Sequence, residues 1–319
     1  MAKVSVVTPF YNTEAYLDEC IRSVLAQTLP DFEYLLVNNR STDGSLAIAE
    51  KYAAADSRIR VITNPAFVPQ VENYNGALAQ ISAETEYCKL VQADDWIYPQ
   101  CLAEMVALAD SDDSIGIVSS YRLDGRRVTC TGVPYTDQVI HGRTICRRHL
   151  LEGIFVFGSP TTLLLRSSIV RSRKPFYEVG RLHEDTEVCY EILKRWNFGF
   201  VHQILSFTRR DNDSIVSVSK AFDPDLLDKL IVIQRFGPMF LTPAEMAACW
   251  RRQETRYLRR MAEAKILGKP PEYWEYQRRG LAMIGYELSG KKLLLHASPV
   301  LLDLALHPKD TLARAMKKR

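Results

Sequence analysis

Apolar positions follow two kinds of pattern along the first half of the chain: short continuous runs and repeats at helical spacing. Short apolar runs without polar alternation are typical of strands covered on both faces. They occur at residues 4–8, 33–37, 58–62, 87–91 and 115–121. Apolar residues recur at helical spacing between these runs, at 13–27, 45–54, 72–82 and 99–109. This order of strands and helices predicts an α/β fold with a doubly wound sheet.

The pattern changes in the second half of the chain. Turn residues and short apolar runs fill 125–143, and an apolar run at 155–165 is broken by a Gly-Ser-Pro turn. A helix is predicted at 187–196 and a strand at 198–202. Beyond Asp223 helical spacing dominates, at 226–236, 243–264 and 271–288. We therefore predict an α/β domain at 1–219 and a helical C-terminal region at 220–319.

Charge is divided between the same two parts. Residues 1–219 contain 22 Lys and Arg against 27 Asp and Glu, a net charge of −5, whereas residues 220–319 contain 19 against 11, a net charge of +8. This basic region has three interpretations: a solvated face of packed helices, attraction to an anionic membrane surface, or nucleic-acid binding. Because no nucleic-acid-binding module is recognisable, we predict no nucleic-acid partner.

Cysteine usage and the N-terminal segment bear on the compartment. The seven cysteines are odd in number and have no C-x-x-C spacing, so neither a zinc site nor a disulfide framework is predicted. The strand-like run begins at Val4, too early for a signal peptide, and no apolar run reaches the roughly 18 residues of a membrane span. We predict a cytoplasmic protein and leave peripheral contact with the inner face of a membrane open.

Polar clusters follow the first four predicted strands. They are residues 8–12, 38–45, 64–65 and 92–96. Ligands bind outside the carboxyl ends of strands in open α/β sheets, so these clusters predict one polar crevice. Its sharpest feature is the adjacent pair Asp94 and Asp95, whose charges repel unless a cation or hydrogen-bond donors offset them. A divalent cation held together with substrate phosphates would do so, while a helix N-cap pair before Pro99 is the simpler alternative.

Three of these segments together resemble the family 2 glycosyltransferases of the GT-A fold. They are VSVVTPFYN at 4–12, VNNRSTDGS at 37–45 and ADD at 93–95, with ENYNGAL at 72–78 and HED at 183–185 as further points of similarity. The resemblance covers about 3–217. It implies a Rossmann-like mixed sheet and an inverting, metal-dependent enzyme of hexosyltransferase type. Such an enzyme moves a sugar from a nucleotide-diphosphate donor to a hydroxyl of a glycan or lipid-linked acceptor, in cell-surface polysaccharide synthesis.

The resemblance also implies a role for individual residues. Asp185 would be the general base, and Asp95 would hold Mg²⁺ or Mn²⁺. Donor contacts would come from Thr8, Pro9, Tyr11, Asn12, Asn38, Asn39, Ser41, Asn73, Asp94, Arg209 and Arg210. Acceptor contacts would come from Ser159, His183 and Glu184.

Several positions depart from the family pattern. Asn38 replaces a common aspartate, Gln92 replaces a third acid, and no histidine lies near 209–217, where Asp211 or Asp213 is the available substitute. Asp185 also has a simpler interpretation as a helix N-cap. These departures keep open a second hypothesis, a catalytically silent relative that binds nucleotide or glycan as a scaffold. The donor base and sugar, the acceptor, the linkage and the oligomeric state are left open.

Overall fold

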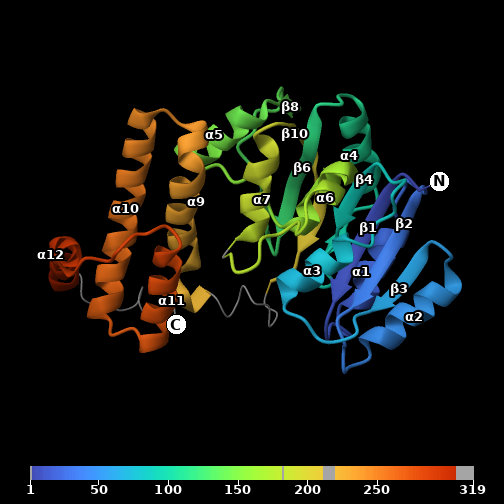
Figure 1. The fold of residues 1–319 in the computed structure, drawn as a ribbon, viewed down its shortest axis with the longest axis horizontal. Coiled ribbons are helices and arrows are strands. Elements are labelled where there is room, and N and C mark those ends of the chain that lie inside the picture. The colour runs from blue at the N-terminus through green and yellow to red at the C-terminus, as the bar shows by residue number, and fades with distance from the viewer. Residues whose placement is uncertain (1, 182, 211–219, 307–319) are drawn as a thin grey trace. The chain divides into compact units, whose positions relative to one another are not determined.

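A computed structural model describes residues 2–181, 183–210 and 220–306 (Figure 1). The chain divides into two compact units, Met1–Arg210 and Asp211–Arg319. The first unit is α/β, and the described elements of the second are all helices, so the predicted helical C-terminal region is confirmed. The predicted boundary after residue 219 falls beside residues 211–219, which lie outside the described residues, and it stays a prediction.

The first unit is built on a mixed ten-stranded sheet. Its order is β3-β2-β1-β4-β9-β6-β10-β5, with β7 paired to β6 and β8 paired to β10. The strands are β1 Val4–Phe10, β2 Phe32–Asn38, β3 Ile59–Thr63, β4 Tyr87–Leu90, β5 Trp96–Ile97, β6 Ile115–Asp124, β7 Arg127–Thr129, β8 Val139–Ile140, β9 Leu164–Arg166 and β10 Asn197–Thr208. The first four in this order are parallel, whereas β9 runs antiparallel to both β4 and β6.

Strand order reverses at β1. The chain runs outward from β1 through β2 to β3 and then crosses to the other side of β1 to form β4. The register pairs Phe10 with Asn38 and Asn38 with Thr63, so these three parallel strands end at the same level. Loops that leave neighbouring strands in opposite directions open a crevice, and ligands of open α/β sheets bind there.

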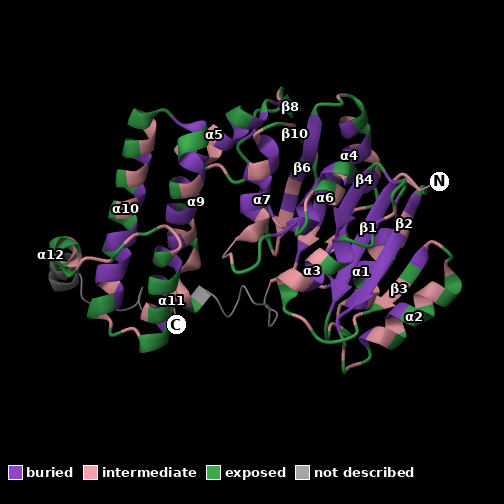
Figure 2. Ribbon diagram, viewed as in Figure 1, coloured by how far each residue is buried: buried purple, intermediate pink, exposed green. Residues whose placement is uncertain are grey.

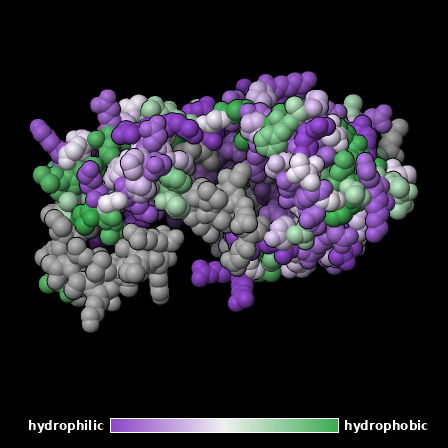
Figure 3. All heavy atoms as spheres, turned by 90° about the horizontal axis from the view of Figure 1, so that it is seen from below, coloured by the Kyte–Doolittle hydropathy of each residue, from purple (hydrophilic) through white to green (hydrophobic). Residues whose placement is uncertain are grey.

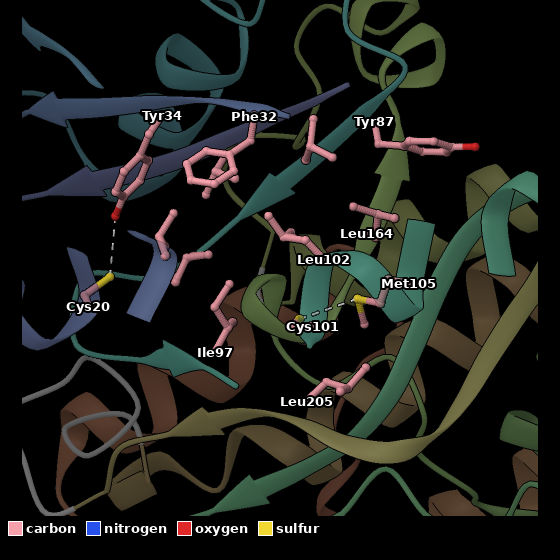
Figure 4. Close-up of a cluster of buried hydrophobic side chains, with 14 of the residues drawn as sticks. Cys20, Phe32, Tyr34, Tyr87, Ile97, Cys101, Leu102, Met105, Leu164 and Leu205 are labelled. Carbon is pink, nitrogen blue, oxygen red and sulfur yellow. Dashed lines mark hydrogen bonds between the residues drawn. The ribbon is translucent and has the colours of Figure 1, made fainter. Parts of the chain in front are cut away.

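Helices cover both faces of this sheet. Helices α1 Leu17–Leu25, α2 Ser45–Ala55 and α4 Cys101–Asp110 share one buried cluster with alternate strand residues. Helices α3 Gln70–Leu78, α6 Ser167–Ser172 and α7 Glu184–Leu193 pack on β1, β4 and β6, and α5 Gly142–Glu152 packs beside α7 and β10. The strands β1, β2, β4 and β6 are accordingly buried along most of their length, whereas the edge strand β3 is mostly partly exposed (Figure 2). Figure 4 shows the cluster, with the Tyr34 hydroxyl directed at Cys20.

The second unit is a set of packed helices. After the short helix η2 Lys220–Phe222 come α9 Pro224–Phe240, α10 Pro243–Ile266, α11 Pro271–Ala282 and α12 Gly290–Leu306. The Asp223 carboxylate joins them, since it accepts hydrogen bonds from Arg260 at 2.7 Å and from the Tyr273 hydroxyl at 3.0 Å. In the part of the chain that the structure describes, no helix has both the length and the apolar character that crossing a membrane requires.

Candidate functional site

The loops after β1 and β2 are tied to each other at the crevice. Asn12 adopts a left-handed φ of 50°, which asparagine tolerates better than most residues. Its side-chain carbonyl accepts the Thr42 backbone N–H at 2.8 Å, and its own N–H donates to the Ser41 hydroxyl at 3.1 Å. This bracing leaves the Tyr11 side chain 44% exposed at the rim of the crevice.

The two amides at the end of β2 are buried and braced. Asn38 accepts the Ser41 N–H at 2.9 Å and donates its side-chain N–H to Thr63 at 3.3 Å. Asn39 donates to the Val68 carbonyl at 2.7 Å and accepts the Val68 N–H at 3.1 Å. The two side chains therefore brace the loop after β2 against β3 and the loop that follows it. The predicted contacts of both amides with the donor stay predictions.

Three other predicted donor residues are buried in the scaffold. Thr8 has no exposed surface, and its hydroxyl lies 3.0 Å from the Tyr34 hydroxyl. Pro9 is buried within β1 opposite Val37. Asn73 of α3 accepts a hydrogen bond from Asn64 at 2.9 Å. Their side chains support the strand ends and the loop after β3.

The acidic pair lies where β5 joins β10. Antiparallel pairing of Trp96 with Phe207 brings the end of β10 beside the residues before β5. The Asp95 carboxylate accepts the Arg209 backbone N–H at 3.2 Å and the Thr208 hydroxyl at 3.3 Å. Burial, reinforced by the neighbouring Asp94 charge, raises the pKa of Asp95 to about 7. The hydrogen bonds therefore do not offset the cost of desolvating this carboxylate.

The two arginines after β10 have different surroundings. Arg209 donates to the Asp94 carbonyl at 3.2 Å, pairs with Glu19 and lies 4.8 Å from the centre of the Tyr16 ring. Arg210 forms an ion pair with Asp124. Arg209 is thus part of the acidic corner, whereas Arg210 is held by the end of β6. Their predicted contacts with a diphosphate stay predictions.

The predicted base is at the N-terminus of α7. His183 is the N-cap residue, and the Asp185 carboxylate accepts the Thr186 backbone N–H at 2.7 Å. Burial and then the Asp185 charge raise the pKa of Glu184 to about 7. Acidic side chains are favourable at this end of a helix, so the N-cap interpretation and a catalytic role are compatible.

Two neighbouring tyrosine rings lie near the acidic pair and the α7 terminus. Tyr74 accepts a hydrogen bond from the Gln92 side chain at 3.2 Å, and its ring centre lies 6.3 Å from that of Tyr177. Burial raises the pKa of both phenols, and the charges of the acidic pair contribute at Tyr74 while Asp185 contributes at Tyr177. The Asn75 side chain accepts the Tyr177 backbone N–H at 2.7 Å and donates to the Tyr177 backbone carbonyl at 2.8 Å. Asn75 therefore ties α3 to the segment that precedes α7.

Ser159 lies in a tight turn over the centre of the sheet. The turn leads into the short helix η1 Pro160–Thr162, which contacts β4, β6 and β10. Gly158 has a φ of 67°, and a Cβ there would lie 2.3 Å from the Thr162 hydroxyl oxygen, so glycine is required. Ser159 donates its backbone N–H to the same hydroxyl at 3.2 Å. Its predicted acceptor contact stays a prediction.

Sequence reasoning missed an aromatic residue at the crevice. Phe67, in the loop after β3, is 58% exposed, and its ring centre lies 4.8 Å from that of Tyr11. An isolated aromatic in a polar loop after a strand was the available signal. Exposed paired rings suit a flat heteroaromatic ligand, because every base has a π-face on which such rings can stack.

A divalent cation at this site would be held by Asp95 and by the phosphates of a bound substrate. Among the described residues, no group of three or more acidic, histidine or cysteine side chains converges on a metal position. Asp211 and Asp213, the predicted substitutes for a histidine, lie outside the described residues. A buried carboxylate with uncompensated charge is nevertheless the ligand that Mg²⁺ or Mn²⁺ accepts when substrate phosphates complete the coordination. The residues present fit such an ion.

The fold and the site define a class of protein. A mixed open sheet carries one polar crevice at its switch point, as in nucleotide-binding α/β proteins. The chain belongs to glycosyl transferase family 2, whose family model matches residues 5–172. The predicted recognition is confirmed, and the protein is a glycosyltransferase.

Curated relatives agree with this assignment. Glycosyltransferase GlyG of Streptococcus pneumoniae is 31% identical over 225 residues, which are 67% of this chain and 72% of GlyG. The poly(ribitol-phosphate) beta-N-acetylglucosaminyltransferase TarS of Staphylococcus aureus is 27% identical over 186 residues. That match covers 56% of this chain and only 30% of TarS.

Solved structures confirm the GT-A fold. TarS 1–349 in complex with UDP-GlcNAc superposes with a TM-score of 0.62 at 20% identity, covering 89% of this chain and 80% of that one. The mannosyltransferase PcManGT from Pyrobaculum calidifontis, in complex with GDP-Man and Mn²⁺, superposes with a TM-score of 0.56 at 14% identity. That superposition covers 99% of this chain and 84% of PcManGT. Divalent metal use occurs among proteins of this fold.

Proposed function

We propose that this chain is an inverting, metal-dependent glycosyltransferase that moves a sugar from a nucleotide-diphosphate donor to an acceptor hydroxyl. The observation that carries the proposal is the desolvated Asp95 carboxylate beside Asp94 at the switch point of the sheet. The charges of this pair act on Tyr74, that of Asp185 acts on Tyr177, and the two tyrosine rings are neighbours, which supports placing Asp185 at the same crevice. The site thus has an acidic corner for the donor and a carboxylate for the acceptor.

The donor half of the reaction would use the loops after β1 to β4. Tyr11 and Phe67 would hold the base, and Asp94 would face the ribose. Asp95 would hold Mg²⁺ or Mn²⁺, which as a Lewis acid stabilises the negative charge that develops on the leaving diphosphate. The Arg209 guanidinium is placed beside the same corner and would supply fixed donors to phosphate oxygens.

The acceptor half would use the N-terminus of α7. The Asp185 carboxylate would take the proton of the attacking hydroxyl as general base. Glu184, whose pKa burial raises to about 7, retains a proton below that pH and could then donate a hydrogen bond to an acceptor oxygen. Attack from the side opposite the diphosphate inverts the anomeric centre. We propose a cell-surface glycan or its lipid-linked precursor as the acceptor; the related TarS is named for transfer to a polymer, poly(ribitol-phosphate).

A thermal-shift screen tests this function directly. The chain is mixed with nucleoside diphosphates and nucleotide sugars, each with and without Mn²⁺, and the unfolding temperature is measured. A ligand at 100 times its Kd stabilises the native state by about 2.7 kcal/mol, so the preferred base and sugar will stand out. Absence of a metal-dependent shift with every nucleotide tested would contradict the proposal.

Tyr11→Ala is expected to weaken donor binding without changing the metal requirement. Stacking of a base on an aromatic ring contributes about 1–3 kcal/mol, so the donor Kd should rise roughly 10-fold. Isothermal titration with the nucleotide from the screen measures this change. Tyr135→Ala, which removes a tyrosine that is 82% exposed elsewhere in the same unit, is the matched control. Equal affinities of the two variants would exclude a stacking role for Tyr11.

We also propose that the basic face of α10 approaches an anionic membrane surface that carries the acceptor. Arg251, Arg252, Arg256 and Arg259 are all exposed on this helix. Figure 3 shows hydrophobic and hydrophilic residues intermingled on the face that it draws. The attraction proposed for α10 would rest on the positive charge of these four arginines. Sedimentation with phosphatidylserine vesicles should be lost when these four arginines become glutamates. Reversal of Arg126 and Arg127 in the first unit should leave it unchanged, and no vesicle binding by the unaltered chain would refute the proposal.

A further inference from the structure

Lys89, in the middle of β4, is a fully buried lysine that the proposed reaction does not use. Its side chain has no exposed surface, and its Nζ donates a hydrogen bond to the Thr161 carbonyl at 2.6 Å. The sulfur of Met105 lies 3.6 Å from the same nitrogen. Burial lowers the pKa of the ammonium group. Burying a lysine costs folding free energy, which its hydrogen bonds offset only in part, so an apolar residue would be the simpler choice here.

Thr161 connects this lysine to the acidic corner that carries Asp94 and Asp95. Its carbonyl accepts from Lys89, and its hydroxyl accepts the Gln92 backbone N–H at 3.0 Å. The Gln92 carbonyl in turn accepts the Asp95 backbone N–H at 3.0 Å, so Thr161 holds the turn that carries Asp95.

We propose that Lys89 is a positioning residue that holds Thr161, and through it the Asp95 carboxylate, in the orientation that binds the divalent cation. This inference rests on the proposed metal role of Asp95. Thr161 belongs to η1, a single short turn outside the sheet ladder, so no regular pairing fixes its height above the strands. The bond from β4 supplies that constraint.

Packing alone does not explain a lysine at this position. Tyr87 and Val91, two residues to either side, contribute to the apolar cluster on the same face of the sheet. Figure 4 shows Cys101 and Met105 of α4 within that cluster. An apolar residue at 89 would suit these neighbours but would leave the buried Thr161 carbonyl without its donor.

Lys89→Met tests the inference, because methionine has a side chain of similar length to lysine but lacks the Nζ hydrogen-bond donor. Mn²⁺ affinity is measured by the paramagnetic resonance of free Mn²⁺ in the presence of the nucleoside diphosphate selected by the screen. Residues that orient metal ligands typically change metal affinity about 10–100-fold, and we expect a loss of that size. Met105→Leu, which removes the neighbouring sulfur but leaves the bond to Thr161, should bind Mn²⁺ like the unaltered chain.

Thr161→Val breaks the same path from its other end. We expect a similar loss of Mn²⁺ affinity, and no further loss in the double variant with Lys89→Met, since residues on one path are not additive. If Lys89→Met does not fold, Lys89→Gln, a neutral donor of shorter reach, should give an intermediate affinity. Unaltered Mn²⁺ affinity in the Lys89 variant, or losses that multiply in the double variant, would overturn the inference alone. Absence of Mn²⁺ binding by the unaltered chain would instead overturn the metal role of Asp95 and this inference with it.

Discussion

Replacing Asp185 with Asn is expected to lower kcat by about 10²–10⁴-fold while leaving donor affinity unchanged, because a positioned general base contributes a factor of that size. Asparagine can still accept the hydrogen bond that the Thr186 N–H donates at 2.7 Å, so the start of α7 should keep its structure. The loss would then reflect the missing base. Single-turnover kinetics with saturating donor measure the change, and titration of the donor measures its affinity.

The control for this variant is Glu191→Gln on the same helix. Glu191 is in an ion pair with Lys194, two turns from the N-terminus, so the change in charge is matched without a change at the site. Its kcat should stay within about twofold of the unaltered value. A decrease of less than tenfold in Asp185→Asn would assign Asp185 to the helix cap alone and would favour Glu184 as the base.

Asp95→Asn is expected to abolish the metal-dependent part of nucleotide binding and to lower kcat/KM at least about 100-fold, since a metal ion contributes several kcal/mol of charge stabilisation. In the absence of metal at pH 8, the variant should unfold at a temperature no lower than the unaltered chain. Burial raises the pKa of Asp95 to about 7, so at pH 8 the native state holds a desolvated anion that the amide would remove.

Thermal unfolding with and without Mn²⁺ and the nucleoside diphosphate measures both effects. Asp113→Asn, at a fully exposed carboxylate of the same unit, is the control and should show the normal metal-dependent shift. A normal shift in Asp95→Asn would place the cation elsewhere. Loss of the shift together with unchanged turnover would separate metal binding from catalysis.

These two variants also bear on the second hypothesis, a silent relative that acts as a scaffold. The family assignment and the glycosyltransferase relatives favour an enzyme. The amide at Asn38, which suggested a departure from activity, bridges Ser41 and Thr63 and therefore has a structural role in this chain. Gln92, the other departure from the family pattern, likewise donates a side-chain hydrogen bond to the Tyr74 hydroxyl.

Periodicity in the sequence predicted the elements that are long and regular. The strands β1 to β4 and β6 and most of their helices lie within a few residues of the predicted ranges, whereas β10 runs to Thr208, well beyond its predicted end at residue 202. The two-residue strand β5 and helix α5 were missed. A two-residue strand has no period to detect, and α5 begins within a stretch of turn residues where Gly142 packs against the Leu193 and Trp196 carbonyls. Only glycine allows that approach, which is a tertiary requirement.

The sequence by itself determined the fold class, the family and the edge of the sheet at which the polar residues gather, because these depend on patterns of neighbouring residues. The tertiary structure decided which of those residues meet. It placed Thr8 in the core and Tyr11 at the rim, and it brought β10 to the acidic pair through β5. It also connected Lys89 with the turn that carries Asp95 through Thr161, which lies 72 positions from Lys89 in the sequence. Contacts of that kind depend on register, crossover and burial, and no local pattern encodes them.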